Sequence, residues 1–557
     1  MKTILTAVNA KYIHTNLAVR YLYNTIKDFS DSEVMEFSIN DNIFTIERKI
    51  ILANPKILCF SCYIWNIRII LNLCSDIKRA LPNVNIILGG PEVSYDAEKI
   101  ISENPFIDYI ICGEGETSFP TLIKHIIFGS NLTDGVYFDN DNKVVKTYSE
   151  YLPDFSVINI PYETGFKDAA GKIIYYESLR GCPYNCKYCL SGEGSKVRFK
   201  DVESVKKDLD YFSDNGITLV KFVDRTFNAD KKRAKEIWKY ISEMNTNTKF
   251  HMEITGEILD DESVEILKRI RGDNLQFEIG VQSTNSDTIR SINRVCNMDI
   301  LFKYIRMLLS ETDIHIHLDL IVGLPNEDFE SFKKSFNDVV GLRPHVLQIG
   351  FLKLLKGSLM REEASKYEII YREYAPYEII SNKFISYDEI IYLKDFEYIF
   401  DKYYNSESFN ETVNYLFKKF DNKFELFCVI VDYYRNNNLI GSSLSKENVF
   451  RILYDCFNYF GDEFVDAIKY DYITALHPGK LPSWLISNGK LLSSDMMYSL
   501  LKNEEIKKKY MSNYYNIPAK IIMKHVHFES FSYGVLMFDY KDDNVYNITQ
   551  FTDNQEV

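Results

Sequence analysis

Three cysteines lie close together at Cys182, Cys186 and Cys189, with three residues between the first two and two between the last two. They follow an apolar, β-branched and aromatic run at 173–179, so they fall in a loop after a predicted strand. Three thiolates from one loop can each bind one iron of a cubane cluster and leave the fourth iron open. A small molecule could bind that open iron and be reduced there. Tyr188 precedes the last cysteine and is expected to cover one side of the loop.

A structural zinc ion, or three unrelated core cysteines, is the alternative for this loop. Zinc normally binds four nitrogen or sulfur ligands. No fourth cysteine or histidine lies at a matching spacing nearby. The ligand count therefore favours an iron–sulfur cluster over zinc.

The C-x3-C-x2-C spacing, with an aromatic residue before the last cysteine, resembles the radical S-adenosylmethionine (SAM) superfamily. The resemblance implies an enzyme with a [4Fe-4S] cluster held by the three cysteines. It also implies that the open iron chelates the methionine amino and carboxylate groups of SAM. The reduced cluster would then cleave SAM to a 5′-deoxyadenosyl radical.

Six strand-like runs alternate with helical patterns in the central region, 173–360. The runs are 173–179, 219–223, 249–254, 275–281, 314–322 and 346–352. Repeated β–α units predict a parallel sheet with right-handed crossovers. Six units fit the partial (βα)6 barrel of the radical SAM family, in which chemistry is expected at the carboxyl ends of the strands.

Polar residues occur within and directly after these apolar strands. A charge inside a barrel is costly unless it is paired or bound to a ligand. The resemblance assigns the turn after the second strand to the SAM amino group, later strands to the ribose or carboxylate, and a Gly-Leu-Pro turn to the adenine. The candidates are Asp224, Arg225, Glu253, Glu278, Gln282 and Gly323. Pairing of these groups with one another, or contact with the outer helices, remains the alternative. His315 and His317 have a metal-like spacing, but without a third ligand we expect a polar wall or sheet packing.

The first 145 residues also alternate strand-like and helix-like runs. Five strands are predicted at 2–8, 34–39, 57–61, 84–88 and 109–112. The pattern predicts a flavodoxin-like, doubly wound α/β domain, in which ligands bind at the carboxyl ends of the strands. The glycine-rich turns there would let a large ligand approach the backbone. A domain that binds a flavin, or nothing, has the same pattern.

Placed before a radical SAM domain, this region resembles the cobalamin-binding domain of cobalamin-dependent radical enzymes. The resemblance implies cobalamin contacts from three strand ends: Ser61, Tyr63, Trp65, Gly89, Gly90, Glu92, Gly113, Glu114 and Gly115. The D-x-H-x-x-G motif of cobalamin mutases is missing after the first strand, which implies cobalamin without a histidine on its lower face. His14 is therefore expected to cap or pack rather than to bind cobalt.

Two further segments complete the predicted organisation. Residues 146–172 have no sustained period and are predicted to be a linker. Residues 361–557 have long aromatic-rich helical patterns and predict a mostly helical domain of unknown function. A β-hairpin is predicted near its end, at 525–528 and 534–540.

Composition limits the class of protein. The formal net charge of −14 over 557 residues argues against a nucleic-acid binder that relies on a basic surface. No apolar run is long enough for a membrane helix, and the N-terminus is not typical of a signal peptide. We therefore expect a cytoplasmic location, where ten cysteines are metal ligands or reduced core residues rather than disulfides.

Together these features predict a cobalamin-dependent radical SAM enzyme that methylates an unactivated carbon or phosphorus. A small-molecule substrate and a low-potential flavodoxin or ferredoxin as electron donor are expected partners. Non-methylating cobalamin chemistry, such as cyclisation or ring rearrangement, is an alternative. A methylthiotransferase-like enzyme is another, with Cys59, Cys62 and Cys112 as candidate ligands of a second cluster. A cobalamin sensor without turnover is the weakest, because it has no use for an open-iron loop.

Overall fold

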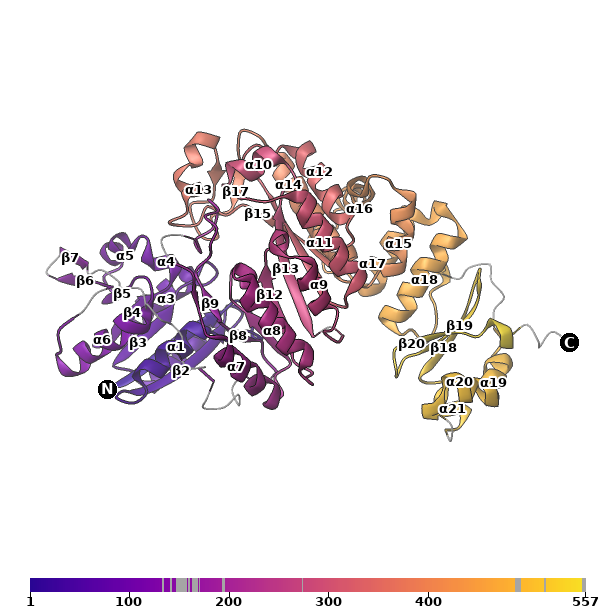
Figure 1. The fold of residues 1–557 in the computed structure, drawn as a ribbon, viewed down its shortest axis with the longest axis horizontal. Helices are drawn as coiled ribbons and strands as arrows, with labels where there is room; N and C mark the ends of the chain where they lie inside the picture. Colours follow the sequence, from indigo (N-terminus) through magenta and orange to yellow (C-terminus); the bar gives the residue numbers. More distant parts are fainter. Residues whose placement is uncertain are drawn as a thin grey trace. The chain divides into compact units, whose positions relative to one another are not determined.

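The computed structural model describes residues 1–132, 135–140, 143–146, 158, 161–162, 169, 171–192, 196–272, 274–485, 492–514 and 517–552. The chain divides into two compact units, Met1–Ile390 and Ile391–Val557 (Figure 1). Most of the linker predicted at 146–172 lies outside the described residues, so its boundaries remain a prediction.

The first sheet occupies the N-terminal part of the first unit, and its strand order is β2-β1-β3-β4-β5-β6-β7. Its strands are β1 (Lys2–Asn9), β2 (Asp31–Ser38), β3 (Ile57–Ser61), β4 (Asn85–Gly89), β5 (Tyr109–Ile111), β6 (Val136–Asn140) and β7 (Lys143–Lys146). Its helices are α1 (Leu17–Ile26), α2 (Ile43–Ala53), α3 (Ile67–Ala80), α4 (Pro91–Ser94), α5 (Ala97–Glu103) and α6 (Gly115–Phe128). The five predicted strands are confirmed and pair in parallel. Two short antiparallel strands, β6 and β7, extend the sheet and were not predicted.

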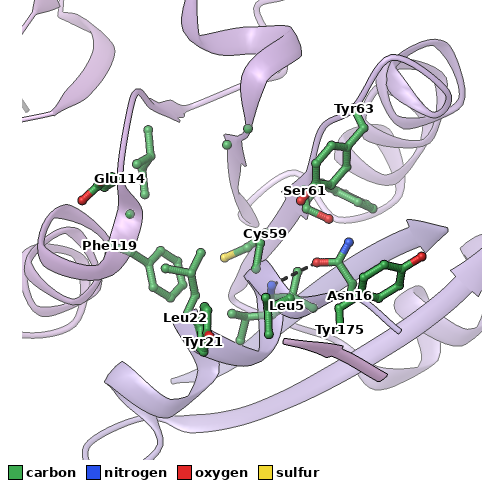
Figure 2. Close-up of a pocket in the computed structure, with 18 of the residues that line it drawn as sticks. Leu5, Asn16, Tyr21, Leu22, Cys59, Ser61, Tyr63, Glu114, Phe119 and Tyr175 are labelled. Atoms are coloured by element: carbon green, nitrogen blue, oxygen red, sulfur yellow. Dashed lines mark hydrogen bonds between the residues drawn. The ribbon is translucent and has the colours of Figure 1, made fainter. Parts of the chain in front are cut away.

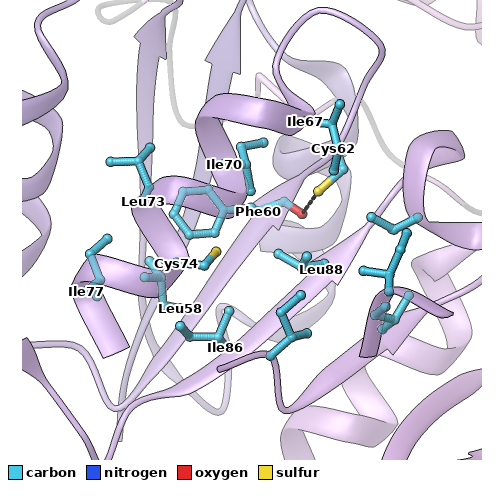
Figure 3. Close-up of a cluster of buried hydrophobic side chains, with 14 of the residues drawn as sticks. Leu58, Phe60, Cys62, Ile67, Ile70, Leu73, Cys74, Ile77, Ile86 and Leu88 are labelled. Atoms are coloured by element: carbon cyan, nitrogen blue, oxygen red, sulfur yellow. Dashed lines mark hydrogen bonds between the residues drawn. The ribbon is translucent and has the colours of Figure 1, made fainter. Parts of the chain in front are cut away.

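Strand β3, which lies inside this sheet, is buried along its whole length, because helices cover both faces of the sheet there. Leu58 and Phe60 pack with the buried side of α3, where Leu73 is fully buried (Figure 3). Cys59, between them, belongs to the core on the opposite face, with residues of α1 and α6. Since both faces are covered, polar groups of β3 are confined to its end.

The second sheet contains six parallel strands in the order β15-β14-β13-β12-β11-β8 (Figure 1). They are β8 (Ile174–Tyr176), β11 (Leu219–Phe222), β12 (Lys249–Ile254), β13 (Leu275–Gln282), β14 (His315–Val322) and β15 (Val346–Phe351). The helices between them are α7 (Val202–Asp214), α8 (Lys231–Glu243), α9 (Asp261–Leu267), α10 (Ser286–Ser291), α11 (Met298–Glu311) and α12 (Phe329–Val340). No pairing joins β15 to β8 in the described part of the chain, so the six-strand partial barrel is confirmed.

The predicted run 173–179 forms two strands rather than one. β8 ends at Tyr176, and the short β9 (Leu179–Arg180) pairs instead with β10 (Arg198–Phe199). Asp224, at the end of β11, holds the bend between β8 and β9. Its Oδ1 accepts hydrogen bonds from the backbone N–H groups of Ser178 and Leu179 at 2.8 and 3.0 Å. Its Oδ2 accepts from the Ser178 hydroxyl at 2.5 Å. The carboxylate that the resemblance assigned to SAM thus supports the strand before the cysteine loop.

The first unit ends with α13 (Leu359–Glu362), the antiparallel pair β16 (Ile370–Tyr371) and β17 (Ile379–Ser381), and part of α14 (Tyr387–Phe400). The second unit contains α15 (Asn410–Lys419), α16 (Lys423–Asn436), α17 (Lys446–Phe457), α18 (Asp462–Leu476), α19 (Ser494–Lys502), α20 (Glu504–Tyr510) and α21 (Ala519–Ile522). The predicted hairpin is confirmed as β18 (Val526–Phe531) and β19 (Gly534–Asp539), and β20 (Asn544–Asn547), which was not predicted, adds a third strand.

No helix in the described part of the chain combines the length and apolar character that crossing a bilayer requires.

Replacement of Leu73 by alanine tests the core of the first sheet. Because Leu73 is fully buried, we expect Leu73→Ala to lower the free energy of unfolding by about 2–5 kcal/mol. Leu52, on the neighbouring α2, is 69% exposed, so Leu52→Ala should change it by less than about 0.5 kcal/mol. Urea unfolding of both variants gives the comparison. Equal losses would show that the α3 face is not a packed core.

Replacement of Asp224 distinguishes a structural acceptor from a SAM ligand. Alanine would leave two buried N–H groups and a hydroxyl without their acceptor, at about 1–3 kcal/mol for each buried group. Asparagine can still accept the two N–H bonds and donate to Ser178. We therefore expect Asp224→Ala, but not Asp224→Asn, to lower the thermal unfolding temperature. If Asp224→Asn kept its stability but failed to bind SAM, direct ligand contact would explain the residue better.

Candidate functional site

The three cysteines line one cavity of about 210 Å³ at the carboxyl ends of the barrel strands. The loop starts at Gly181, whose φ of +92° strongly favours glycine. The Cys189 sulfur accepts the Ser191 N–H at 3.4 Å, and the Cys182 sulfur lies 3.4 Å from the Thr226 hydroxyl oxygen.

The donor set suits a cluster better than a single ion. Among the described residues, no group of three or more His, Cys, Asp or Glu side chains is placed to hold one metal ion. Each thiolate of a cubane binds a different iron, so three thiolates spread around one cavity fit that group.

Most of the predicted SAM contacts lie around the same cavity. Tyr188, Arg225, Glu253, Glu278 and Gln282 line it together with the cysteines. Asp224 and Gly323 are not among the lining residues. Asp224 supports the preceding bend, as described above. The Gly323 carbonyl accepts a hydrogen bond from the Asn382 side chain at 2.9 Å.

Sequence reasoning missed several other lining residues: Tyr184, Thr226, Ile254, Thr255, Gly280, Arg294 and Asp319. Arg294 comes from the segment after α10, which has no motif to mark it. Its guanidinium donates to the Gly280 carbonyl at 2.5 Å. Asp319 was visible as a polar residue within an apolar strand, and that signal could have identified it.

The surroundings lower the pKa of one carboxyl group in this cavity and raise the pKa of another. The Arg225 guanidinium lies 3.3 Å from a Glu253 carboxylate oxygen. Burial would raise the pKa of Glu278, but the hydrogen bond from His251 at 3.0 Å and the charge of Lys221 outweigh it and lower that pKa. Burial, with repulsion from Glu278 and Glu253, raises the pKa of Asp319 well above its usual value. Asp319 therefore takes up a proton more readily than an ordinary aspartate does.

Unsatisfied polar atoms indicate that a polar ligand belongs in this cavity. The Gln282 Oε1, Asp319 Oδ1 and Arg294 Nε atoms are buried without a hydrogen-bond partner among the described residues. Buried polar groups are normally paired, so three such atoms around one cavity fit a ligand with several donors and acceptors, as SAM has.

The two histidines with metal-like spacing lie deeper in the barrel. His317 Nε2 is 2.9 Å from His315 Nδ1, and the His251 ring packs edge-on against His317 at 5.5 Å. This contact agrees with the expected polar wall.

A larger cavity of about 690 Å³ lies at the carboxyl ends of the first sheet (Figure 2). All but one of the predicted cobalamin contacts line it: Ser61, Tyr63, Trp65, Gly89, Gly90, Gly113, Glu114 and Gly115. Glu92 does not line it, because its carboxylate points to Tyr377 at 2.8 Å.

The larger cavity combines an apolar floor with a polar rim. Leu5, Leu22, Cys59 and Phe119 form part of the floor (Figure 2); in the sequence they could not be distinguished from ordinary core residues. The buried Ser61 hydroxyl has no hydrogen-bond partner among the described residues. An apolar floor below a polar rim fits a large ligand with an apolar part, such as cobalamin.

Backbone and ring contacts shape the rim of the larger cavity. Gly90 has φ +110°, and a Cβ there would lie 2.5 Å from the Cys62 carbonyl oxygen, so only glycine fits the turn. The Tyr63 and Trp65 rings stack 4.5 Å apart. His14 also lines the cavity, and its Nδ1 is 2.7 Å from the Tyr175 hydroxyl. This contact does not distinguish packing from cobalt binding, so the packing role expected for His14 stays a prediction.

The barrel supplies one side of the larger cavity, which the sequence did not indicate. Tyr175, Glu177, Arg180, Val223 and Arg225 line it. Arg225 also lines the cysteine cavity, so the two cavities adjoin at the turn after β11.

An ion-pair network joins the first sheet to the strand before the cysteines. Arg180 donates to Glu116 at 2.7 Å and to Glu177 at 2.8 Å, and lies 3.4 Å from Glu114. Arg198 pairs with Glu114 as well. All five side chains are largely buried. The network holds the Gly113–Glu116 turn against β9.

The candidate ligands of a second cluster do not converge. Cys59 lines the larger cavity, whereas Cys62 belongs to the core on the opposite face of the sheet. The Cys112 sulfur donates to the Ser94 carbonyl at 3.5 Å.

Comparison with known proteins identifies three successive sequence families in the chain. The B12 binding domain matches residues 4–123, the radical SAM superfamily matches residues 176–339, and a "Protein of unknown function (DUF4080)" matches residues 365–550.

Two curated relatives are methyltransferases. The 2-(S-pantetheinyl)-carbapenam-3-carboxylate methyltransferase of Streptantibioticus cattleyicolor is 26% identical over 315 residues, 53% of this chain and 46% of the relative. The cobalamin-dependent radical SAM methyltransferase TokK of Streptomyces tokunonensis is 25% identical over 331 residues, 54% of this chain and 48% of TokK. The chain thus spans about half the length of these relatives.

A solved structure supports the fold over most of the chain. The cobalamin-dependent SAM radical enzyme OxsB, with aqua-cobalamin and SAM bound, aligns with a TM-score of 0.62 at 14% identity, covering 88% of this chain and 82% of OxsB. Three successive parts of the chain therefore match the B12 binding domain, the radical SAM superfamily and DUF4080, and the fold resembles that of OxsB.

Proposed function

We propose that this protein is a cobalamin-dependent radical SAM enzyme that methylates an unactivated carbon or phosphorus of a small molecule. The proposal includes a cytoplasmic location and a low-potential flavodoxin or ferredoxin as electron donor. The named activities of the relatives support methylation. Cyclisation or ring rearrangement, the non-methylating alternative, would use the same cavities.

The position of Arg225 is the observation that carries the proposal. A cavity suited to a cluster and SAM, and a cavity suited to cobalamin, share this side chain as a common wall. A reaction that needs all three groups requires them to be close together, because positioning supplies much of the catalysis.

Different residues would bind the cluster, orient SAM and exclude water. Cys182, Cys186 and Cys189 would hold the cluster, and Tyr188 would shield it from solvent. Glu253, Glu278 and Gln282 would orient SAM, and a protonated Asp319 could donate a hydrogen bond to it. The apolar floor under the larger cavity would exclude water from the corrin. When bound, the cluster and SAM supply a carbon-centred radical, and cobalamin supplies a methyl group.

The methylthiotransferase alternative needs a second cluster on N-terminal cysteines. The separation of Cys59 from Cys62 across the sheet gives no support to it. The sensor alternative needs no cluster, so the cysteine cavity argues against it.

Metal analysis of protein purified and reconstituted without oxygen tests the proposal. We expect about one cobalt and four irons per chain, as one corrinoid and one cubane require. About eight irons without cobalt would favour the methylthiotransferase. Four irons without cobalt, even with corrinoid supplied, would exclude the cobalamin assignment.

Single cysteine variants test the cluster ligands separately from the cobalamin cavity. Cys182→Ala, Cys186→Ala or Cys189→Ala should reduce the iron content from about four to less than about one per chain, because a cubane on two thiolates is labile. Cobalt uptake should persist, because the larger cavity does not include these cysteines. Cys428→Ala, in α16 of the second unit, is the matched control and should retain all its iron.

A further inference from the structure

A segment after the last barrel strand contacts three loops that lie in or beside the candidate site. It comprises residues 353–382, which we call the strap. The DUF4080 match begins within it, at residue 365. The strap folds back on itself, because Lys353 forms an antiparallel bridge with Glu378 and β16 pairs with β17. It belongs to the first unit, together with both cavities.

The first contact holds the turn beside the larger cavity. Tyr377 donates its hydroxyl to Glu92 Oε2 at 2.8 Å, and Lys356 Nζ donates to the Glu92 carbonyl at 3.3 Å. Glu92 is only 4% exposed, and it follows the Gly89–Gly90 turn that lines the cavity. Burial raises the pKa of Glu92, while the bond from Tyr377 opposes that rise. The hydroxyl thus stabilises a buried carboxylate at the edge of the cavity.

Close packing surrounds this first contact. Lys356 forms an ion pair with Asp96 at 3.1 Å. The Arg361 guanidinium lies over the Tyr377 ring, 4.8 Å from its centre. Gly357 has φ +82°, and a Cβ there would lie 2.1 Å from the Tyr95 ring. The strap therefore lies directly against α4 and the residues that follow it.

The second contact is with the cysteine loop. Met360 donates its backbone N–H to the Lys187 carbonyl at 2.8 Å, and the Lys187 ammonium pairs with Glu363 at 2.9 Å. Lys187 lies between Cys186 and Cys189. The strap thus makes both a backbone and a side-chain contact to a residue between two predicted cluster ligands.

The third contact is with the Gly-Leu-Pro turn of the barrel. The Asn382 side chain donates to the Gly323 carbonyl at 2.9 Å. A Cβ on Gly323 would lie 2.7 Å from Ile379. The strap therefore contacts loops from the first sheet, the cysteine loop and the far side of the barrel within thirty residues.

We propose that the strap is a positioning element that fixes the turn beside the larger cavity and the cysteine loop relative to each other. Tyr377 and Asn382 of the region of unknown function, together with Met360 and Glu363 just before it, would then complete the cofactor site. The inference rests on the proposed function for the identity of the bound groups, and it adds a role for Tyr377 and Glu363 as positioning residues.

Cobalamin affinity of the full-length Tyr377→Phe variant tests the first contact. The variant keeps the ring and removes only the hydroxyl from a buried carboxylate, so we expect its Kd for cobalamin to rise about tenfold. Tyr374→Phe is the matched control, because Tyr374 is 51% exposed in the same segment, and its Kd should stay unchanged. Absorbance titration of anaerobically reconstituted protein gives both values.

A double variant shows whether Tyr377 acts through Glu92. If it does, Tyr377→Phe should add little to the effect of Glu92→Gln, because residues in direct contact are not additive. If the two substitutions changed the Kd additively, Tyr377 would not act through Glu92, and the proposed role of the first contact would be wrong. If Tyr377→Phe lowered the unfolding temperature but left the Kd for cobalamin unchanged, Tyr377 would have a purely structural role. That result would also contradict the proposed role of the first contact.

The second contact is tested on the cluster. SAM binding to the open iron should change the electron paramagnetic resonance spectrum of the reduced cluster. We expect Glu363→Gln to weaken the apparent SAM affinity in this titration about threefold to tenfold, because it removes a partly exposed ion pair that holds the loop. Glu362→Gln, at the neighbouring exposed position, should match the wild type. Equal apparent SAM affinities for the two variants would contradict the proposed role of the second contact.

The outcomes separate the strap from the proposed function. If the wild type binds cobalamin and SAM but all strap variants match their controls, the proposed function stands and the strap inference fails. If the wild type binds no cobalamin, the proposed function fails, and the Glu363→Gln titration still decides the role of the strap at the cysteine loop.

Discussion

Parallel strand pairing is the constraint on which this structure depends. In a parallel sheet all carboxyl ends lie at the same edge, so the turns that follow them meet there. The first sheet brings together the turns after β1, β3, β4 and β5, and the barrel does the same for β8 and β11–β14. Since the helices cover the apolar faces of the strands, the strand ends are where polar groups can reach a ligand.

Parallel pairing brings the turns after the strands close to one another. Buried polar contacts then fix the positions of these turns. Asp224 holds the bend before the cysteine loop through two N–H groups and a hydroxyl. The Arg180 guanidinium forms ion pairs with three glutamates, which come from two domains. A buried charge is tolerated only with partners, and here the partners come from different segments. The same interactions that satisfy these charges therefore also join the two domains at the site.

The cavities differ in the kind of ligand they can take. The smaller one has buried, unpaired polar atoms and charged side chains, which suits a compact polar ligand and a cluster. The larger one has an apolar floor and a glycine turn that no other residue fits. Because both cavities are lined by Arg225, groups bound in them would be close enough to take part in one reaction. The strap adds further contacts, and two of the residues that make them, Tyr377 and Asn382, lie in the region that its family name leaves without a function.

The sequence by itself determined the cysteine loop, the number of strands in the barrel and the first five strands of the N-terminal sheet. These features are local: spacing, periodicity and turn residues show them directly. It failed where partners are distant. Asp224 and Glu92 have the residue types of ligand contacts, but Ser178 and Tyr377 occupy their carboxylates. Arg294, Tyr175 and the apolar floor have no local signal, and β6 and β7, which combine apolar with polar residues, were not predicted. Only the tertiary structure decided which polar groups meet each other and which face a cavity, because that depends on how loops far apart in sequence converge at one edge of a sheet.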